Sequence, residues 1–64
     1  MNLGIVGLGR MGAAISQRLR QQGFDVVGWD HNADVNRALA AGGLRIAGNP
    51  REIAARSDIV ISII

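Results

Sequence analysis

The sequence predicts an α/β fold, in which a parallel β-sheet carries helices on both faces. Short apolar runs alternate with segments of helical periodicity along the chain. The helical segments are bounded by residues typical of helix starts and ends, among them Asn32, Asn49 and Gly23. A hydrophobic content of 48% is typical of a packed domain. Strands that alternate with helices fold as right-handed βαβ units, so the predicted order is β-α-β-α-β-α-β.

The first half of the chain predicts two strands and one helix. Residues 3–6 form an apolar run that ends at a glycine, which indicates a buried strand. Helical spacing extends over residues 10–22, and Gly23 then provides a helix stop. Residues 24–29 predict the second strand. The predicted inner face of the helix consists of Met11, Ala14, Ile15 and Leu19.

The second half of the chain repeats this alternation. A helix is predicted from an N-cap at Asn32 to about Ala41, and residues 44–47 form a short third strand. Pro50 suits the first position of a third helix, over residues 50–56. The β-branched run 59–64 predicts the fourth strand. The inner face of the second helix is expected to hold Val35, Ala38, Leu39 and Ala41.

Composition excludes several classes of function. The net charge is +2, and the cations are scattered arginines without an adjacent basic run, so nucleic-acid binding is not predicted. The absence of cysteine excludes a disulfide framework or a thiolate metal site, and we expect no metal-binding residues. No apolar segment is long enough to cross a membrane, and the first residues do not resemble a signal peptide. We therefore expect a cytoplasmic protein without membrane partners.

The loop that follows the first strand carries the pattern G-x-G-x-x-G. The pattern alone is common in a chain with nine glycines, but this one joins a strand to a helix, as phosphate binding requires. The first glycine permits the tight turn, the second admits a pyrophosphate, and the third lets the helix pack on the strand. Backbone N–H groups at the helix start then face the phosphates. The predicted cofactor-binding residues of this loop are Gly7, Leu8, Gly9, Arg10, Met11 and Gly12.

Asp30 is the second predicted cofactor-binding element. It ends the second strand, 18 residues beyond Gly12, where a carboxylate accepts the ribose hydroxyls of an adenosine. Its charge would repel a 2′-phosphate, which favours NAD over NADP. The neighbouring His31 and Arg37 leave NADP open, because a cation there could receive a phosphate. Together these features predict a dinucleotide-binding domain of the Rossmann type.

Structural interpretations stay open for the same residues. The glycine-rich turn could be a tight strand–helix connection without a ligand, and Asp30 could be a turn residue that caps the second helix. His31 could lie in solvent. The side chains of Met11 and Trp29 are expected to pack in the core.

Residues 4–12, Gly-Ile-Val-Gly-Leu-Gly-Arg-Met-Gly, resemble the N-terminal signature of the β-hydroxyacid dehydrogenases. That family includes 3-hydroxyisobutyrate dehydrogenase, 6-phosphogluconate dehydrogenase and tartronate semialdehyde reductase. The resemblance continues through residues 26–30, 49–50 and 57–61 and covers essentially the whole chain. It implies that residues 7–12 form the phosphate loop and that Asp30 and His31 stand at the ribose. NADP-using relatives often have Asn-Arg at these two positions, which again favours NAD.

The resemblance also implies an activity for a longer protein. Family members oxidise a small β-hydroxy acid with NAD(P), sometimes with decarboxylation. Their general acid/base is a lysine, and this chain has none, so we expect no catalytic residue here and no activity of the chain alone. Residues 1–64 are then the N-terminal part of the dinucleotide-binding domain. The rest of that domain and a C-terminal helical domain are expected outside the chain, in a protein that forms a homo-oligomer.

Two other functions stay open. An NADPH-dependent reductase of imines or carbonyl compounds begins in a very similar way, and a preference for NADP would favour it. A non-catalytic module that senses a nucleotide is the second alternative.

Overall fold

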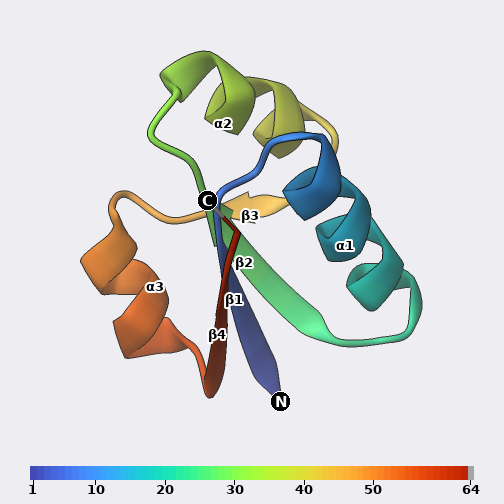
Figure 1. The fold of residues 1–64 in the computed structure, drawn as a ribbon. Helices are drawn as coiled ribbons and strands as arrows, with labels where there is room; N and C mark the ends of the chain where they lie inside the picture. The colour runs from blue at the N-terminus through green and yellow to red at the C-terminus, as the bar shows by residue number, and fades with distance from the viewer. Residues whose placement is uncertain (64) are drawn as a thin grey trace.

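The computed structural model describes residues 1–63 and contains one parallel sheet (Figure 1). Its strands pair in the order β3-β2-β1-β4, where the elements span Asn2–Val6 (β1), Asp25–Trp29 (β2), Arg45–Ile46 (β3) and Ile59–Ser62 (β4). Helices connect successive strands and span Arg10–Gln21 (α1), Ala33–Ala41 (α2) and Pro50–Arg56 (α3). The predicted element order and parallel sheet are confirmed.

The sheet separates two apolar clusters, because successive side chains of a strand point to opposite faces. Leu3 and Ile5 of β1 and Val26 of β2 are buried on the face covered by α1 and α2. Val27 is buried on the opposite face, against Ile53 of α3. Figure 1 shows α3 on one side of the strands and α1 on the other.

The buried face of α1 differs from the predicted one. Gly12 and Ser16 are buried, whereas Met11 is 65% exposed and Ala14 is exposed as well. The expectation that Met11 packs in the core is therefore wrong. The helix approaches β1 closely, so small residues face the sheet. The Ser16 hydroxyl donates a 2.7 Å hydrogen bond to the carbonyl oxygen of Gly12. This buried hydroxyl therefore has a hydrogen-bond partner.

Element boundaries agree with the predictions to within one or two residues. The third helix and the end of the second match, and Gly23 takes a positive φ of 93° after α1. The third strand is shorter than predicted, at two residues. The fourth strand ends at Ser62, and residue 64 of the predicted strand lies outside the described residues.

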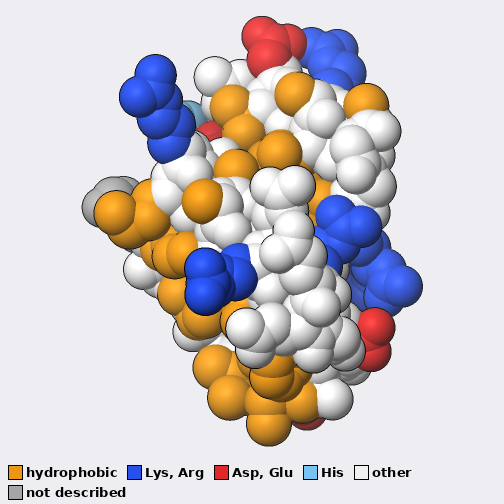
Figure 2. Space-filling model, turned by 90° about the vertical axis from the view of Figure 1, so that its right-hand side faces the viewer, with side chains coloured by type: hydrophobic (Ala, Val, Ile, Leu, Met, Phe, Trp, Pro, Cys, Tyr) orange, Lys and Arg blue, Asp and Glu red, His pale blue; other side chains and the backbone are white. Residues whose placement is uncertain are grey.

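The described surface combines separate charges with exposed apolar side chains. On the face shown in Figure 2, basic side chains lie at several places, some of them side by side at the right-hand edge, and hydrophobic ones gather at the lower end. The exposed large hydrophobic residues include Met1, Ile59 and Val60. None of the helices in residues 1–63 has the length and apolar character needed to cross a membrane.

Candidate functional site

A groove opens where β1, β2 and β4 end, at the carboxyl edge of the parallel sheet. This edge is where open α/β sheets bind their ligands. The groove has a volume of about 360 Å³, and its lining combines apolar side chains with glycine backbone and one carboxylate. The lining residues are Val6, Gly7, Gly9, Trp29, Asp30, His31 and Ile63.

A side chain would have different consequences at each of the three loop glycines. Gly7 has a φ of 98°, and a Cβ there would collide with the carbonyl oxygen of Ile63. At Gly12, a Cβ would collide with the carbonyl oxygen of Gly7. Gly9 has an ordinary φ of −61°, and apart from Gly9 and its chain neighbours no heavy atom of residues 1–63 lies within 4 Å of the position that its Cβ would take. The described fold therefore requires glycine at positions 7 and 12 but leaves open space beside Gly9.

Among the residues that the structure describes, the backbone N–H groups at the start of α1 have no protein acceptor. Within residues 1–63, no carbonyl or side chain accepts a hydrogen bond from the N–H groups of residues 9–12, and Gly9 provides no side-chain cap. By contrast, Asn32 caps α2 and Asn49 caps α3, each through its side-chain oxygen. The first turn of α1 thus presents unpaired donors and the positive end of the helix dipole. Such a site suits an anion.

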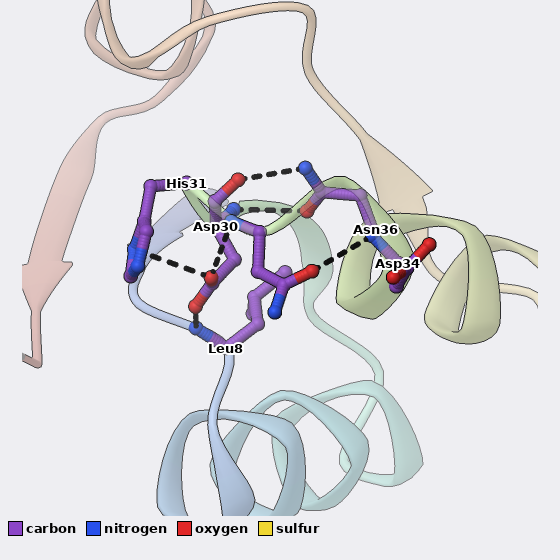
Figure 3. A network of polar contacts seen from close by, with 6 residues as sticks. Leu8, Asp30, His31, Asp34 and Asn36 are labelled. Atoms are coloured by element: carbon purple, nitrogen blue, oxygen red, sulfur yellow. Dashed lines mark hydrogen bonds and ion pairs between the residues drawn. The ribbon is translucent and has the colours of Figure 1, made fainter.

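Asp30 lies directly after β2, only 8% exposed, and binds two backbone N–H groups (Figure 3). Its Oδ1 accepts from Asn32 N at 2.9 Å, and its Oδ2 accepts from Leu8 N at 2.7 Å. His31 Nδ1 lies 3.4 Å from Oδ1. The N–H groups of Asn32 and Leu8 hold the pKa of Asp30 below its ordinary value, with a smaller contribution from His31, although burial opposes the shift.

This geometry leaves the carboxylate able to accept more hydrogen bonds. An ionised carboxylate has about four lone-pair positions, and the protein N–H groups occupy two of them. The bond to Asn32 N also makes Asp30 part of the turn that leads into α2, as the structural interpretation expected. The cap of α2 is Asn32 and not Asp30, so that part of the interpretation is wrong. Turn formation and ligand contact are thus compatible in the same side chain.

The remaining predicted site residues differ in their surroundings. The Leu8 side chain is buried over Gly28, and its N–H is already donated to Asp30. The side chains of Arg10 and Met11 are exposed. These two residues therefore contribute to the start of α1 through their backbone N–H groups. The His31 side chain is 91% exposed beside the groove.

Two features of this region have no recognisable signal in the sequence. The first is the bond between Leu8 N and Asp30, which joins residues 22 positions apart. The second is Asn36, whose side chain binds the backbone N–H and carbonyl of Asp30. Asparagine on an exposed helix has no distinctive pattern, so no sequence signal pointed to it. Arg37, considered above as a phosphate partner, forms an ion pair with Asp34 on α2.

The described residues offer no metal centre. Across residues 1–63, no three histidine, aspartate or glutamate side chains come together in a way that could hold a metal ion.

Comparison with known proteins places the chain in one family. The family described as the NAD binding domain of 6-phosphogluconate dehydrogenase matches residues 2–64. Among curated proteins, L-threonate dehydrogenase of Cupriavidus necator is 38% identical over 98% of this chain and 21% of its own length. Among solved structures, 3-hydroxyisobutyrate dehydrogenase of Mycobacterium tuberculosis superposes with a TM-score of 0.90 at 32% identity, over 98% of this chain and 22% of that one.

An imine reductase variant from Myxococcus stipitatus, solved in complex with NAD+, superposes equally well. Its TM-score is 0.90 at 30% identity, over 98% of this chain and 22% of that structure. The chain spans about a fifth of the length of each of these proteins.

Proposed function

Because this chain belongs to the family of the NAD binding domain of 6-phosphogluconate dehydrogenase, we propose that it holds a nicotinamide dinucleotide at the groove. The pyrophosphate lies against Gly9 and the unpaired N–H groups of residues 9–12. The open space beside Gly9 is the observation that carries this assignment, since the fold itself does not need glycine there. Gly7 and Gly12 shape the loop, and Leu8 anchors it through Asp30.

We propose that Asp30 accepts the ribose hydroxyls and makes NAD the preferred cofactor. Its lowered pKa keeps the carboxylate charged at neutral pH. Two like charges about 4 Å apart repel by roughly 4 kcal/mol at an effective dielectric near 20, so a 2′-phosphate is disfavoured. Arg37 forms an exposed ion pair with Asp34, whose negative charge weakens the attraction that Arg37 would exert on that phosphate. His31 lines the same end of the groove and completes the proposed ribose contacts.

For the longer protein we propose hydride transfer between a small β-hydroxy acid and the nicotinamide. The bound cofactor supplies the hydride acceptor, and this chain positions it without a catalytic residue of its own. The likeness to L-threonate and 3-hydroxyisobutyrate dehydrogenases supports this substrate class. We expect the longer protein to be cytoplasmic and to form a homo-oligomer. Reduction of a C=N bond is the second candidate, supported by the likeness to the imine reductase.

Calorimetric titration with NAD and with NADP tests the binding proposal. We expect wild type to bind NAD more tightly than NADP. The variant Gly9→Ala should lose most of its affinity for both, because a Cβ fills the space that the phosphates need. Its free energy of unfolding should fall by no more than about 1 kcal/mol, the ordinary difference between glycine and alanine at an N-cap, since that Cβ meets no atom of residues 1–63 beyond its chain neighbours.

Gly42→Ala is the matched control. A Cβ at Gly42 makes only ordinary contact with the carbonyl oxygen of Leu39, and this position lies at the end of α2. Its cofactor affinities should equal those of wild type. Binding of NAD to Gly9→Ala as tightly as to wild type would refute the assignment of the pyrophosphate.

A further inference from the structure

We infer that Asn36 is a positioning residue that sets the discrimination between NAD and NADP by holding the backbone of Asp30 in place. This inference rests on the proposed dinucleotide site. It concerns a side chain on α2 that is not part of the groove lining.

Asn36 makes two hydrogen bonds to the main chain of one residue (Figure 3). Its Oδ1 accepts from Asp30 N at 2.9 Å, and its Nδ2 donates to Asp30 O at 2.7 Å. The side chain is half-buried, and α2 fixes its position. Two bonds to the same residue restrict both translation and rotation of that segment, which one bond would not do.

The sheet does not hold Asp30 in this way. On one side, pairing with β3 ends at Gly28, whose carbonyl accepts from Ala47 N. On the other, the last bond of β2 runs from Gly7 N to Trp29 O. Within residues 1–63, the carboxamide of Asn36 provides the hydrogen bonds of the Asp30 backbone.

The fixed backbone directs the carboxylate toward the phosphate loop. From this position Asp30 reaches Leu8 N at 2.7 Å and Asn32 N at 2.9 Å. A carboxylate held by these contacts cannot turn away when a 2′-phosphate approaches, so the repulsion persists. It also stays oriented toward ribose hydroxyls, which strengthens NAD binding. Discrimination therefore depends on the Asn36 contacts as well as on the presence of Asp30.

The test compares Asn36→Ala and Asn36→Leu with wild type in NAD and NADP titrations of the full chain. Both variants remove the two bonds. Alanine and leucine favour helix, and leucine also keeps the branched shape of the side chain, so at least one variant should fold. We expect the ratio of the NADP to the NAD dissociation constant to fall about tenfold in both, mainly through weaker NAD binding. A purely structural role would weaken both cofactors equally and leave the ratio unchanged.

Asn49→Ala is the matched control, because it removes the same carboxamide from the start of α3. Its ratio should stay within about twofold of wild type. A second measurement needs no cofactor: exchange of the Leu8 amide hydrogen, monitored by NMR and corrected for the free energy of unfolding of each variant, should be faster in both Asn36 variants and unchanged in Asn49→Ala.

The outcomes separate this inference from the proposed function. If wild type binds neither cofactor, the proposed function fails, and this inference fails with it. If wild type binds both equally, or prefers NAD with a ratio that the Asn36 variants share, the inference fails while dinucleotide binding stands. Unchanged exchange at Leu8 in the Asn36 variants would likewise overturn it.

Discussion

At the scale of single residues, Asp30 keeps a negative charge in a position that is almost closed to solvent. Loss of hydration disfavours that charge, and the N–H groups of Asn32 and Leu8 compensate for it. The same two bonds connect the start of α2 to the phosphate loop. Ionisation of this one carboxylate should therefore contribute to folding as well as to ligand binding.

The first prediction at this scale is a stability that decreases in acid. Because the pKa of folded Asp30 lies below the value near 3.9 of an unfolded chain, the unfolded state takes up a proton first as the pH falls. The contribution of Asp30 is thus complete above about pH 5 and disappears as the pH falls through the folded-state pKa.

Urea unfolding of wild type and Asp30→Asn over this pH range measures the contribution. The free energy of unfolding of the variant should depend less steeply on pH. Some dependence should persist through Glu52, whose pKa is also lowered, chiefly by the N–H of Gly48 and then by Arg56. Equal slopes for wild type and Asp30→Asn would show that the carboxylate is not held as described.

At the scale of elements, the three helices begin in different ways. The Asn32 and Asn49 side chains accept from N–H groups of the first turns of α2 and α3. The start of α3 is further closed by Glu52, which accepts from Gly48 N at 2.9 Å. Helix α1 lacks a side-chain cap, and it is the helix that starts at the groove. Capping and ligand binding use the same N–H groups, so a helix start can serve one or the other.

The prediction for elements is that Asn49→Ala lowers the free energy of unfolding by about 1 kcal/mol, because it leaves a first-turn N–H of α3 without its acceptor. Urea unfolding measures the loss. Asn49→Asp, which keeps an acceptor oxygen, should recover most of it. A similar loss in both variants would mean that Asn49 stabilises the protein in another way.

At the scale of the whole molecule, α3 is attached to the sheet mainly through Ile53. This side chain is fully buried and packs with Val27 and Ala47. Gly4 of β1 lies beneath it, where a Cβ would approach Ile53 to 2.6 Å. Close contact between helix and strand thus depends on a large residue on one side and a glycine on the other.

The prediction for the whole molecule is that Ile53→Ala lowers the free energy of unfolding by roughly 3 kcal/mol through lost burial and a residual cavity. Ile53→Val should lower it by only about 1 kcal/mol. For a chain of this size these losses are a large part of the total, and thermal unfolding should resolve them. Ile53→Ala as stable as wild type would contradict the described packing of α3.

Much of the site could be predicted from sequence because its signals are local. The G-x-G-x-x-G pattern lies between a strand and a helix, and Asp30 follows the next strand. The inner face of α1 was predicted less well, since periodicity favours large apolar residues such as Met11. The structure instead buries Gly12 and Ser16, because only small residues allow α1 to approach β1 so closely. Periodicity reports hydrophobicity and carries no information on the distance between elements.

The sequence by itself determined the alternation of strands and helices, the helix caps and stops, and the glycine loop at the first strand end, because each depends on residues near one another in the chain. Only the tertiary structure decided that Asp30 binds Leu8 N, that Asn36 holds the backbone of Asp30, and that the space beside Gly9 is open. The first and last of these depend on how separate elements are placed in space. The Asn36 contact depends on how the turn after β2 returns to α2. No short-range pattern in the sequence encodes these distances.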